Sequence, residues 1–402
     1  LPGLVLGMAA GLSGALLSIA PLGLALEENF GLDGLFLWRG ARPVPSEVVI
    51  VSLDKTSARR FGLPNEARKW PRQLHARLVE NLSQAGASVV GFDIHFQEPR
   101  DPVQDAYLAR AIQAAGNVVL FEYLRKEAHP LTNGAGGGAE VLTESLIPPM
   151  PALARAAVAT APFPLPKVPV KVSQYWLFKE GAGDPPTLPV VMFQLHALAA
   201  YPDLRRLLQD LNPAASGLPQ DIATVIHDRK LREVMEQLRL LIREPEVSAR
   251  LLAQIASAPD LSEPKRRQLN ALAHIYSDRN SRYLNYYGPP RSITTLPFYE
   301  VWQANSRADA AALGVRGKIV LVGFSARLQP EQKDGFYTVY SQEASGLDIS
   351  GVEIAATALA NMIEDNPVQV LPMTTQAGLI LAWGLLIGFV ALWRDASLAI
   401  AV

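Results

Sequence analysis

Four oxygen-bearing side chains follow apolar, β-branched runs in this sequence and are the residues best placed to do chemistry. Asp54 comes directly after one run and Asp93 lies near the end of a second. Ser325 and Asp334 follow a third. Because ligands of parallel α/β sheets bind beyond the carboxyl ends of strands, the pattern predicts a site for a polar ligand, or for a divalent cation held by oxygen atoms. The alternative is structural: Asp54 caps a helix and Asp93 bonds to nearby backbone amides.

Other side chains that could act chemically have positions typical of structural roles. Residues 70–72, Trp-Pro-Arg, are typical of a helix entry, with the tryptophan stapling the preceding loop onto the core. His75 and His95 stand alone, as satisfied core or surface histidines do. Glu353 either pairs with a cation on a loop or faces water, and water is favoured. The glycine-rich residues 134–138 lack the strand before and the helix after that a phosphate-binding loop needs. We therefore expect no cofactor, no metal ligands and no catalysis within these residues.

Composition excludes several classes of protein. The chain has 402 residues, 49% of them hydrophobic, which is enough for a sizeable core together with membrane segments. Its formal net charge of −1 gives no basic face for nucleic acid. It contains no cysteine, so disulfides, thiolate nucleophiles and cysteine-ligated metals are excluded.

The elements that must position the four side chains alternate along the chain. Strands are expected at residues 47–53, 88–94, 117–121 and 318–323, with helices at 71–85, 105–115, 188–200 and 351–361. This spacing predicts an α/β fold with a mainly parallel sheet, flanking helices and right-handed crossovers. Shorter strands are expected at 170–178 and 282–287. The charged, leucine-rich residues 203–277, interrupted by prolines, predict a helical insertion.

Two long uncharged segments flank this region. Residues 1–26 and 371–393 carry no charged side chain, and about 20 apolar residues suffice to cross a bilayer. We expect transmembrane helices at both ends, the first uncleaved rather than a signal peptide. Residues 394–395, Arg-Asp, are typical of a tight turn before a further membrane helix that starts at residues 396–402. Arg394 favours a cytoplasmic turn, which would place residues 27–370 outside the cytoplasm.

Short pieces spread over the external region carry a family resemblance. They are residues 49–54 with Ser57, residues 70–72, His75, residues 92–96 with Glu98, Asp105 with residues 108–109, residues 116–120, 284–288 and 317–323, Asp334 with Phe336 and Thr338, and residues 351–354. In this order, between two apolar segments, they resemble the CHASE domain of the second type, an extracytoplasmic sensor of bacterial transmembrane receptors. The chain departs from that pattern at Lys55, where the family usually has an acidic residue, and residues 203–277 have no recognised counterpart.

The resemblance implies a sensor in the bacterial inner membrane, joined through several membrane helices to a cytoplasmic adenylate or guanylate cyclase, histidine kinase or serine/threonine kinase. The chain is then expected to be part of a longer protein. Its expected partners are membrane lipid, a small extracytoplasmic ligand and a second copy, because such outputs work as pairs. Two alternatives stay open. One is a membrane-anchored assembly or scaffolding protein that docks through residues 203–277; the other is an extracytoplasmic hydrolase using Asp54 and Asp93 as acid and base.

Overall fold

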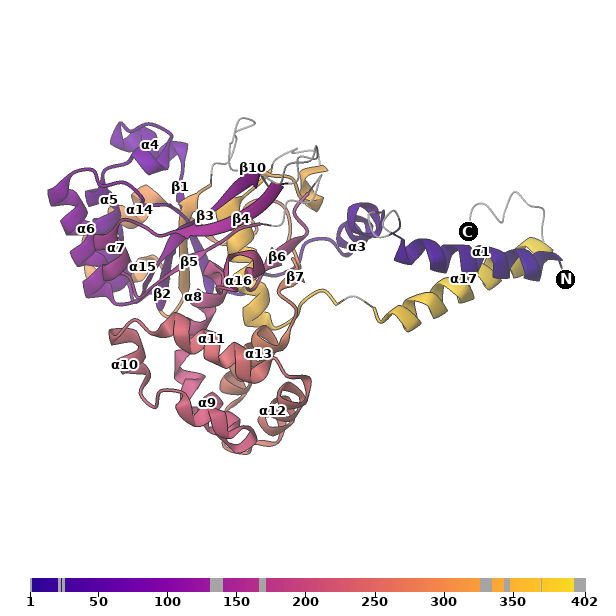
Figure 1. Ribbon diagram of the computed structural model, residues 1–402. Coiled ribbons are helices and arrows are strands. Elements are labelled where there is room, and N and C mark those ends of the chain that lie inside the picture. Colours follow the sequence, from indigo (N-terminus) through magenta and orange to yellow (C-terminus); the bar gives the residue numbers. More distant parts are fainter. Residues whose placement is uncertain are drawn as a thin grey trace. The chain divides into compact units, whose positions relative to one another are not determined.

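The computed structural model describes the chain except residues 1, 21–22, 24–25, 131–139, 166–170, 326–334, 343–347, 370 and 394–402 (Figure 1). The chain forms two compact units. The larger one comprises residues 42–367, and the smaller one comprises residues 1–41 together with 368–402.

The larger unit is built on a mainly parallel sheet, as the sequence predicts. Its described strands run in the order β4-β3-β2-β9-β1-β8, with β5 paired to β3. The strands that pair in parallel are β1 (Val48–Leu53), β2 (Val89–Phe92), the first part of β3 (Val118–Pro130), β5 (Ala159–Pro162), β8 (Thr295–Pro297) and β9 (Ile319–Phe324). The late strand β9 lies between β1 and β2, pairing Val48 and Val89 with Ile319. A segment far along the chain thus completes the centre of the sheet.

One edge of the sheet departs from the predicted pattern. Strand β3 (Val118–Pro130) runs past the expected end at residue 121 and pairs in antiparallel fashion with β4 (Glu140–Ile147). Two small antiparallel pairs lie outside the main sheet. One joins β6 (Gln174–Trp176) to β7 (Ser281–Tyr283), and the other joins β10 (Gly335–Phe336) to β11 (Ile349–Ser350).

Helices cover both faces of the sheet, because both faces of its strands are apolar (Figure 1). Side chains such as Val51, Phe92 and Val322 belong to the core shared with the helices of one face. That face carries α5 (Arg72–Gln84), α6 (Pro102–Ala115), α7 (Pro151–Ala156), α14 (Phe298–Trp302) and α15 (Arg307–Ala312), with α4 (Lys55–Phe61) after β1. The opposite face is packed by α8 (Leu188–His196) and α16 (Gly351–Glu364).

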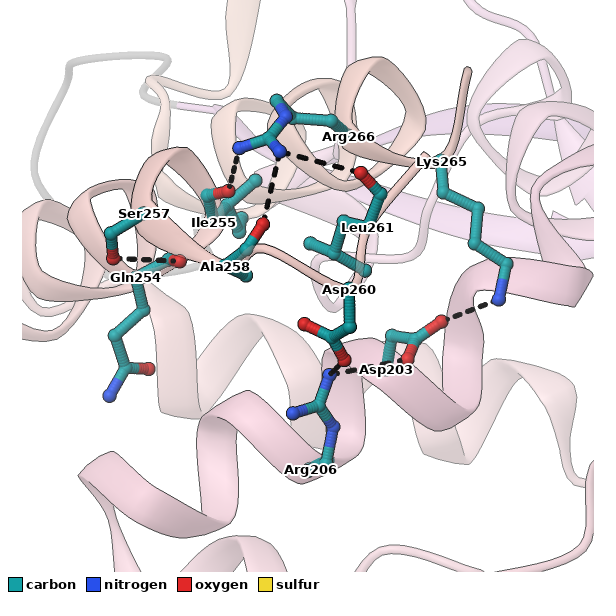
Figure 2. Close-up of polar contacts among 10 residues, drawn as sticks. All are labelled: Asp203, Arg206, Gln254, Ile255, Ser257, Ala258, Asp260, Leu261, Lys265 and Arg266. Atoms are coloured by element: carbon teal, nitrogen blue, oxygen red, sulfur yellow. Dashed lines mark hydrogen bonds and ion pairs between the residues drawn. The ribbon is translucent and has the colours of Figure 1, made fainter. Parts of the chain in front are cut away.

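Residues 203–277 fold as the predicted helices and are part of the larger unit. They form most of α9 (Tyr201–Leu211) and all of α10 (Ile222–His227), α11 (Leu231–Ile242), α12 (Pro245–Ser257) and α13 (Glu263–Ser277). Arg266 caps the C-terminal end of α12. Its guanidinium donates to the carbonyl oxygens of Ile255 at 2.7 Å and Ala258 at 3.0 Å (Figure 2). These carbonyls have no partner inside their own helix, so the arginine satisfies groups that would otherwise need water.

A second set of contacts in the same figure joins α9 to α13 and to the loop before α13. Asp203 accepts from Lys265 at 2.8 Å, and Arg206 pairs with Asp260 at 2.7 Å (Figure 2). Single-turn helices complete the unit: η2 (Ala67–Lys69), η3 (Glu180–Ala182), η4 (Leu198–Ala200), η5 (Pro213–Gly217) and η6 (Val339–Gln342).

The smaller unit is helical. It contains α1 (Pro2–Ile19), a π-helical turn η1 (Glu27–Gly31), α3 (Leu32–Arg39) and α17 (Met373–Trp393). Helices α1 and α17 pack closely through glycines: a Cβ on Gly384 would lie 2.7 Å from the Cα of Gly11, and one on Gly7 would lie 2.6 Å from the carbonyl oxygen of Gly384. Only glycine permits this approach of the two backbones.

Among the described helices, α17 alone is long and apolar enough to cross a membrane, over Met373–Val390. The apolar stretch of α1, Val5–Ile19, is shorter. The expectation of spanning helices at both ends therefore has support at the C-terminal end only. The predicted turn at residues 394–395 and the further apolar run lie outside the described residues.

Candidate functional site

The structure brings three of the four predicted site residues to the same edge of the sheet. Asp54, Asp93 and Ser325 follow the neighbouring strands β1, β2 and β9 at their carboxyl ends. The backbone N–H of Asp93 donates to the carbonyl of Val322 at 2.8 Å, which places it alongside Gly323. Asp334, the fourth predicted residue, lies outside the described residues.

The first turn of α16 packs closely against the end of β9 at this edge of the sheet. A Cβ on Gly323 would lie 2.7 Å from Cβ of Val352, in the first turn of α16, and 3.2 Å from Cβ of Asp93. Glycine at residue 323 is therefore required for the helix start and the aspartate to flank the end of β9.

Asp54 has the structural role that was the alternative to ligand binding. It is the N-cap of α4, and its Oδ1 accepts from the backbone N–H of Ser57 at 2.7 Å. Its Oδ2 accepts from the hydroxyl of Ser52 at 3.3 Å. Both oxygens are thus engaged locally, which is the usual work of an aspartate at a helix start.

Arg291 links the end of β9 to α16. Its Nη2 donates to the carbonyl of Ser325 at 2.6 Å, and its backbone N–H donates to Oε1 of Glu353 at 2.9 Å. Arg291 adopts a left-handed backbone conformation with φ of 72°. Such a conformation is uncommon for a residue other than glycine and clusters at ligand sites and switch regions.

Glu353 corrects the expectation that it faces water, because it is buried. Its Oε2 accepts from the hydroxyl of Ser350 at 3.0 Å and from the backbone N–H of the same residue at 3.2 Å. This is a capping box, in which the third helical residue turns back to the helix start. The spacing Ser-x-x-Glu before an apolar run is the signal that could have shown it.

Three polar residues meet at the strand ends, next to the N-terminus of α16. They are Asp93, the buried Ser325, and Arg291, whose guanidinium is engaged by the carbonyl of Ser325. Within the described part of the chain, no three His, Asp or Glu side chains are grouped so that they could hold a metal ion. The cation alternative therefore has no ligand set among these residues.

The two histidines near the predicted motifs have structural surroundings. The ring of His75 lies in an aromatic cage with Phe92, Phe96 and Phe298, at centroid distances of 6.1, 5.4 and 5.8 Å. Burial, together with the positive charges of Arg72 and Arg100, lowers the pKa of His75 to about 3. A histidine held neutral in this way contributes packing.

His95 and Trp70, by contrast, have hydrogen-bond partners within the fold. Nε2 of His95 lies 3.1 Å from the carbonyl of Ile147, and its ring stacks on Tyr123. Burial lowers the pKa of His95 against the opposing effect of its backbone hydrogen bonds. Trp70 is buried and donates from Nε1 to the carbonyl of Pro64 at 2.8 Å, holding the preceding loop on the core.

A polar cluster that sequence reasoning missed ties together the two points where the larger unit begins and ends. This terminal clamp consists of Arg42, Asn285, Tyr287, Asn361 and Glu364. The Nη1 atom of Arg42 lies 2.6 Å from Oε2 of Glu364, and its guanidinium covers the ring of Tyr287 at 3.9 Å from the centroid. The hydroxyl of Tyr287 donates to Glu364 at 2.9 Å. Burial and the neighbouring carboxylate raise the pKa of Tyr287.

The rest of the clamp is formed by the side chain of Asn361. Its Oδ1 accepts from the backbone N–H of Asn285 at 2.9 Å, and its Nδ2 donates to the carbonyl of the same residue at 3.0 Å. These groups are buried, so every hydrogen bond removed leaves an unsatisfied partner. One turn further along, Asp365 pairs with Nδ1 of His274 in α13 at 2.7 Å.

Comparison with known proteins gives one match. The family model described as CHASE2 domain matches residues 8–389, nearly the whole chain. No curated protein and no solved structure matches the chain.

Proposed function

Because the chain belongs to the CHASE2 domain family of extracytoplasmic sensors, we propose that it is the sensor and membrane region of a bacterial transmembrane receptor. In this proposal, residues 27–370 lie in the periplasm or outside the cell, anchored in the inner membrane. A small polar ligand binds at the strand ends beside Asp93 and Ser325. A cytoplasmic cyclase or kinase, working as a homodimer, responds to the conformational change that ligand binding causes.

The observation that carries the proposal is the path of α16. The helix begins at the edge that holds Asp93, Arg291 and Ser325, and it ends in the terminal clamp. Its 14 residues span about 20 Å at 1.5 Å per residue. Nearly all of them are buried, so the helix moves within its packing as one piece rather than bending.

A ligand can act through this helix only by binding two arrangements of it with different affinity. One arrangement has Glu364 held by Arg42 and Tyr287. A displaced α16 start would move Glu364 and weaken these contacts. The larger unit begins at residue 42 and ends at residue 367, so weaker contacts between Arg42 and Glu364 would affect both chain connections to the smaller unit.

The alternatives have less support. An extracytoplasmic hydrolase would need Asp54 as acid or base, but both of its oxygens are engaged in capping α4. A docking scaffold would use the helices of residues 203–277 as its docking surface, but these helices already have a structural role, because Tyr276 of α13 is fully buried and donates to Gln194 of α8 at 2.7 Å.

Placement outside the cytoplasm is tested with a single engineered cysteine, since the chain has none. Leu240 on α11 is 75% exposed, so Leu240→Cys presents a reactive thiol without disturbing the core. We expect a membrane-impermeant maleimide to label it in intact cells whose outer membrane has been permeabilised. Labelling that appears only after lysis of the inner membrane would refute the proposal.

The ligand site is tested by thermal-shift screening of the purified chain against small polar metabolites. A compound that raises the melting temperature is retested on Asp93→Asn and on the matched control Asp101→Asn, which alters a surface N-cap on α6. We expect the first variant to bind at least about tenfold more weakly, because a charge-assisted contact is lost. Equal affinity of Asp93→Asn and the unaltered chain would place the ligand elsewhere.

A further inference from the structure

Residues 26–39 expose large apolar side chains in a short helical segment. Phe30 is 70% exposed and Trp38 is 88% exposed, and Leu26, Leu35 and Leu37 are also open to the surroundings. Between them, Asp33 and Phe36 are turned inward and buried. Apolar side chains on several sides of one helix are typical of a helix that lipid or protein covers.

A hydrogen bond fixes where this segment lies relative to the spanning helix. Nε2 of Gln376 donates to Oε2 of Glu27 at 3.2 Å. Gln376 belongs to the first turn of α17, the end at which the membrane-crossing stretch Met373–Val390 begins. The turn η1 is therefore at the level where α17 enters the bilayer.

The composition of the segment suits that boundary and excludes a crossing. Residues 26–39 are too few to span a bilayer and include four charged residues, Glu27, Glu28, Asp33 and Arg39. Tryptophan is enriched at the interface between lipid headgroups and acyl chains, because its ring is apolar and its N–H is polar. Arg39, whose guanidinium lies over the ring of Phe36 at 4.7 Å, is placed for contact with lipid phosphate.

We propose that residues 26–39 lie in the interfacial layer of a phospholipid membrane, with Phe30, Leu35 and Trp38 in contact with the acyl boundary. The inference rests on the proposed function, in which α17 crosses the membrane. Lipid is favoured over a protein partner because the segment contacts the first turn of α17, where the candidate membrane-crossing stretch begins. The segment then anchors the connection into the larger unit at a set depth.

The test uses spin labels on single cysteines in the otherwise cysteine-free chain. Leu35→Cys and Trp38→Cys are labelled with a nitroxide in vesicles of phosphatidylcholine and phosphatidylglycerol. Accessibility to oxygen, which concentrates in lipid, is compared with accessibility to a water-soluble nickel chelate. Leu240→Cys on the larger unit is the water control, and Leu385→Cys on α17 is the bilayer control.

We expect labels at residues 35 and 38 to favour oxygen over nickel, with values between those of the two controls. Values equal to those at residue 240 would refute the interfacial position. Low accessibility to both reagents, with spin–spin broadening, would also refute it by showing a second copy as the cover. If the label at residue 385 has the high oxygen accessibility of a bilayer site while labels at residues 35 and 38 have the high nickel accessibility of a water-exposed site, the interfacial inference fails and the membrane crossing of α17 stands.

Discussion

His75 makes the folded state sensitive to acid. Burial and the charges of Arg72 and Arg100 hold its pKa near 3, whereas a histidine in an unfolded chain has a pKa of about 6.5. Below pH 6.5 the His75 imidazole is protonated in the unfolded state, whereas in the folded state it stays neutral down to about pH 3. The stability that the neutral ring provides is therefore complete above pH 6.5 and is lost as the pH falls through this window.

We expect His75→Phe, which keeps an aromatic ring in the cage of Phe92, Phe96 and Phe298, to flatten the pH dependence. The free energy of unfolding of the unaltered chain should fall by about 3 kcal/mol between pH 7 and pH 4 through this group alone. Urea titrations at several pH values measure the slope. The exposed His227→Gln is the control and should keep the original slope. An unchanged slope in His75→Phe would contradict the assignment.

Arg42 is the residue on which the terminal clamp depends most. It pairs with Glu364, donates to the carbonyl of Asn285 at 3.1 Å and covers Tyr287. We expect Arg42→Ala to lower the free energy of unfolding by about 2 kcal/mol, because charge-assisted and cation–π contacts of partly buried groups are lost together. Denaturant unfolding followed by tryptophan fluorescence measures it.

The matched control for Arg42→Ala is Glu127→Ala, which removes the exposed pair with Arg125 at 3.4 Å. Pairs of this kind contribute less than about 0.5 kcal/mol when they lie in water. Equal losses in the two variants would mean that the clamp has no more strength than an ordinary surface ion pair.

At the scale of elements, the glycines between α1 and α17 set how closely the two helices lie. A Cβ on Gly384 would meet the backbone of Gly11 at 2.7 Å, whereas one on Gly378 of the same helix would meet nothing within 4 Å. Gly384→Leu should therefore force the helices apart, and Gly378→Leu should be tolerated. Forced overpacking typically costs about 1–3 kcal/mol.

Disulfide formation between Gly14→Cys and Ile380→Cys measures this separation, because a Cβ on residue 14 would lie 2.9 Å from Cγ2 of Ile380. In membranes, adding Gly384→Leu should slow formation of this disulfide at least about fivefold, the factor that corresponds to 1 kcal/mol. Adding Gly378→Leu should leave the rate unchanged. Equal rates in both variants would show that the glycine contact does not hold the helices together.

The strands of the central sheet could be predicted because they are buried on both faces. Residues 48–51 and 319–322 are continuous apolar runs, and the expected strands at 47–53 and 318–323 form as β1 and β9. Strand β4 gives no such run, because residues 143–145 of Glu140–Ile147, Thr-Glu-Ser, are polar and separate two apolar pairs. Local pattern alone does not reveal that this segment pairs with β3.

The place of two candidate site residues in the fold could be predicted, and their role in binding a ligand stays a prediction. Asp93 and Ser325 lie at strand ends as expected, because each follows an apolar run typical of a strand. Arg42 and Glu364 were missed because they are 322 residues apart and have no motif around them. Only the folded sheet brings the start and the end of the larger unit together, so tertiary structure rather than local sequence creates the clamp.

At the scale of the whole molecule, residues 203–277 are part of the core of the larger unit. Arg232 of α11 pairs at 2.7 Å with Glu122, a buried carboxylate on β3, and donates to the carbonyl of Thr160 at 2.6 Å. The side chains of Leu269 and Tyr276 in α13 are fully buried. The helices therefore cover apolar surface and compensate a charge that belongs to the sheet.

Deletion of residues 203–277 should consequently abolish cooperative folding. It would remove Arg232, the partner of the Glu122 carboxylate, and would uncover the apolar surface under α13. The free energy of unfolding of natural domains is only about 5–15 kcal/mol, so we expect these losses together to unfold the larger unit. Calorimetry and limited proteolysis of the deleted chain measure the outcome.

The control for this deletion is Leu240→Glu, which alters the same insertion at an exposed position and should melt like the unaltered chain. A deleted chain that still unfolds in one sharp transition would show that the insertion is a separable module, and the docking-scaffold alternative would then regain its support.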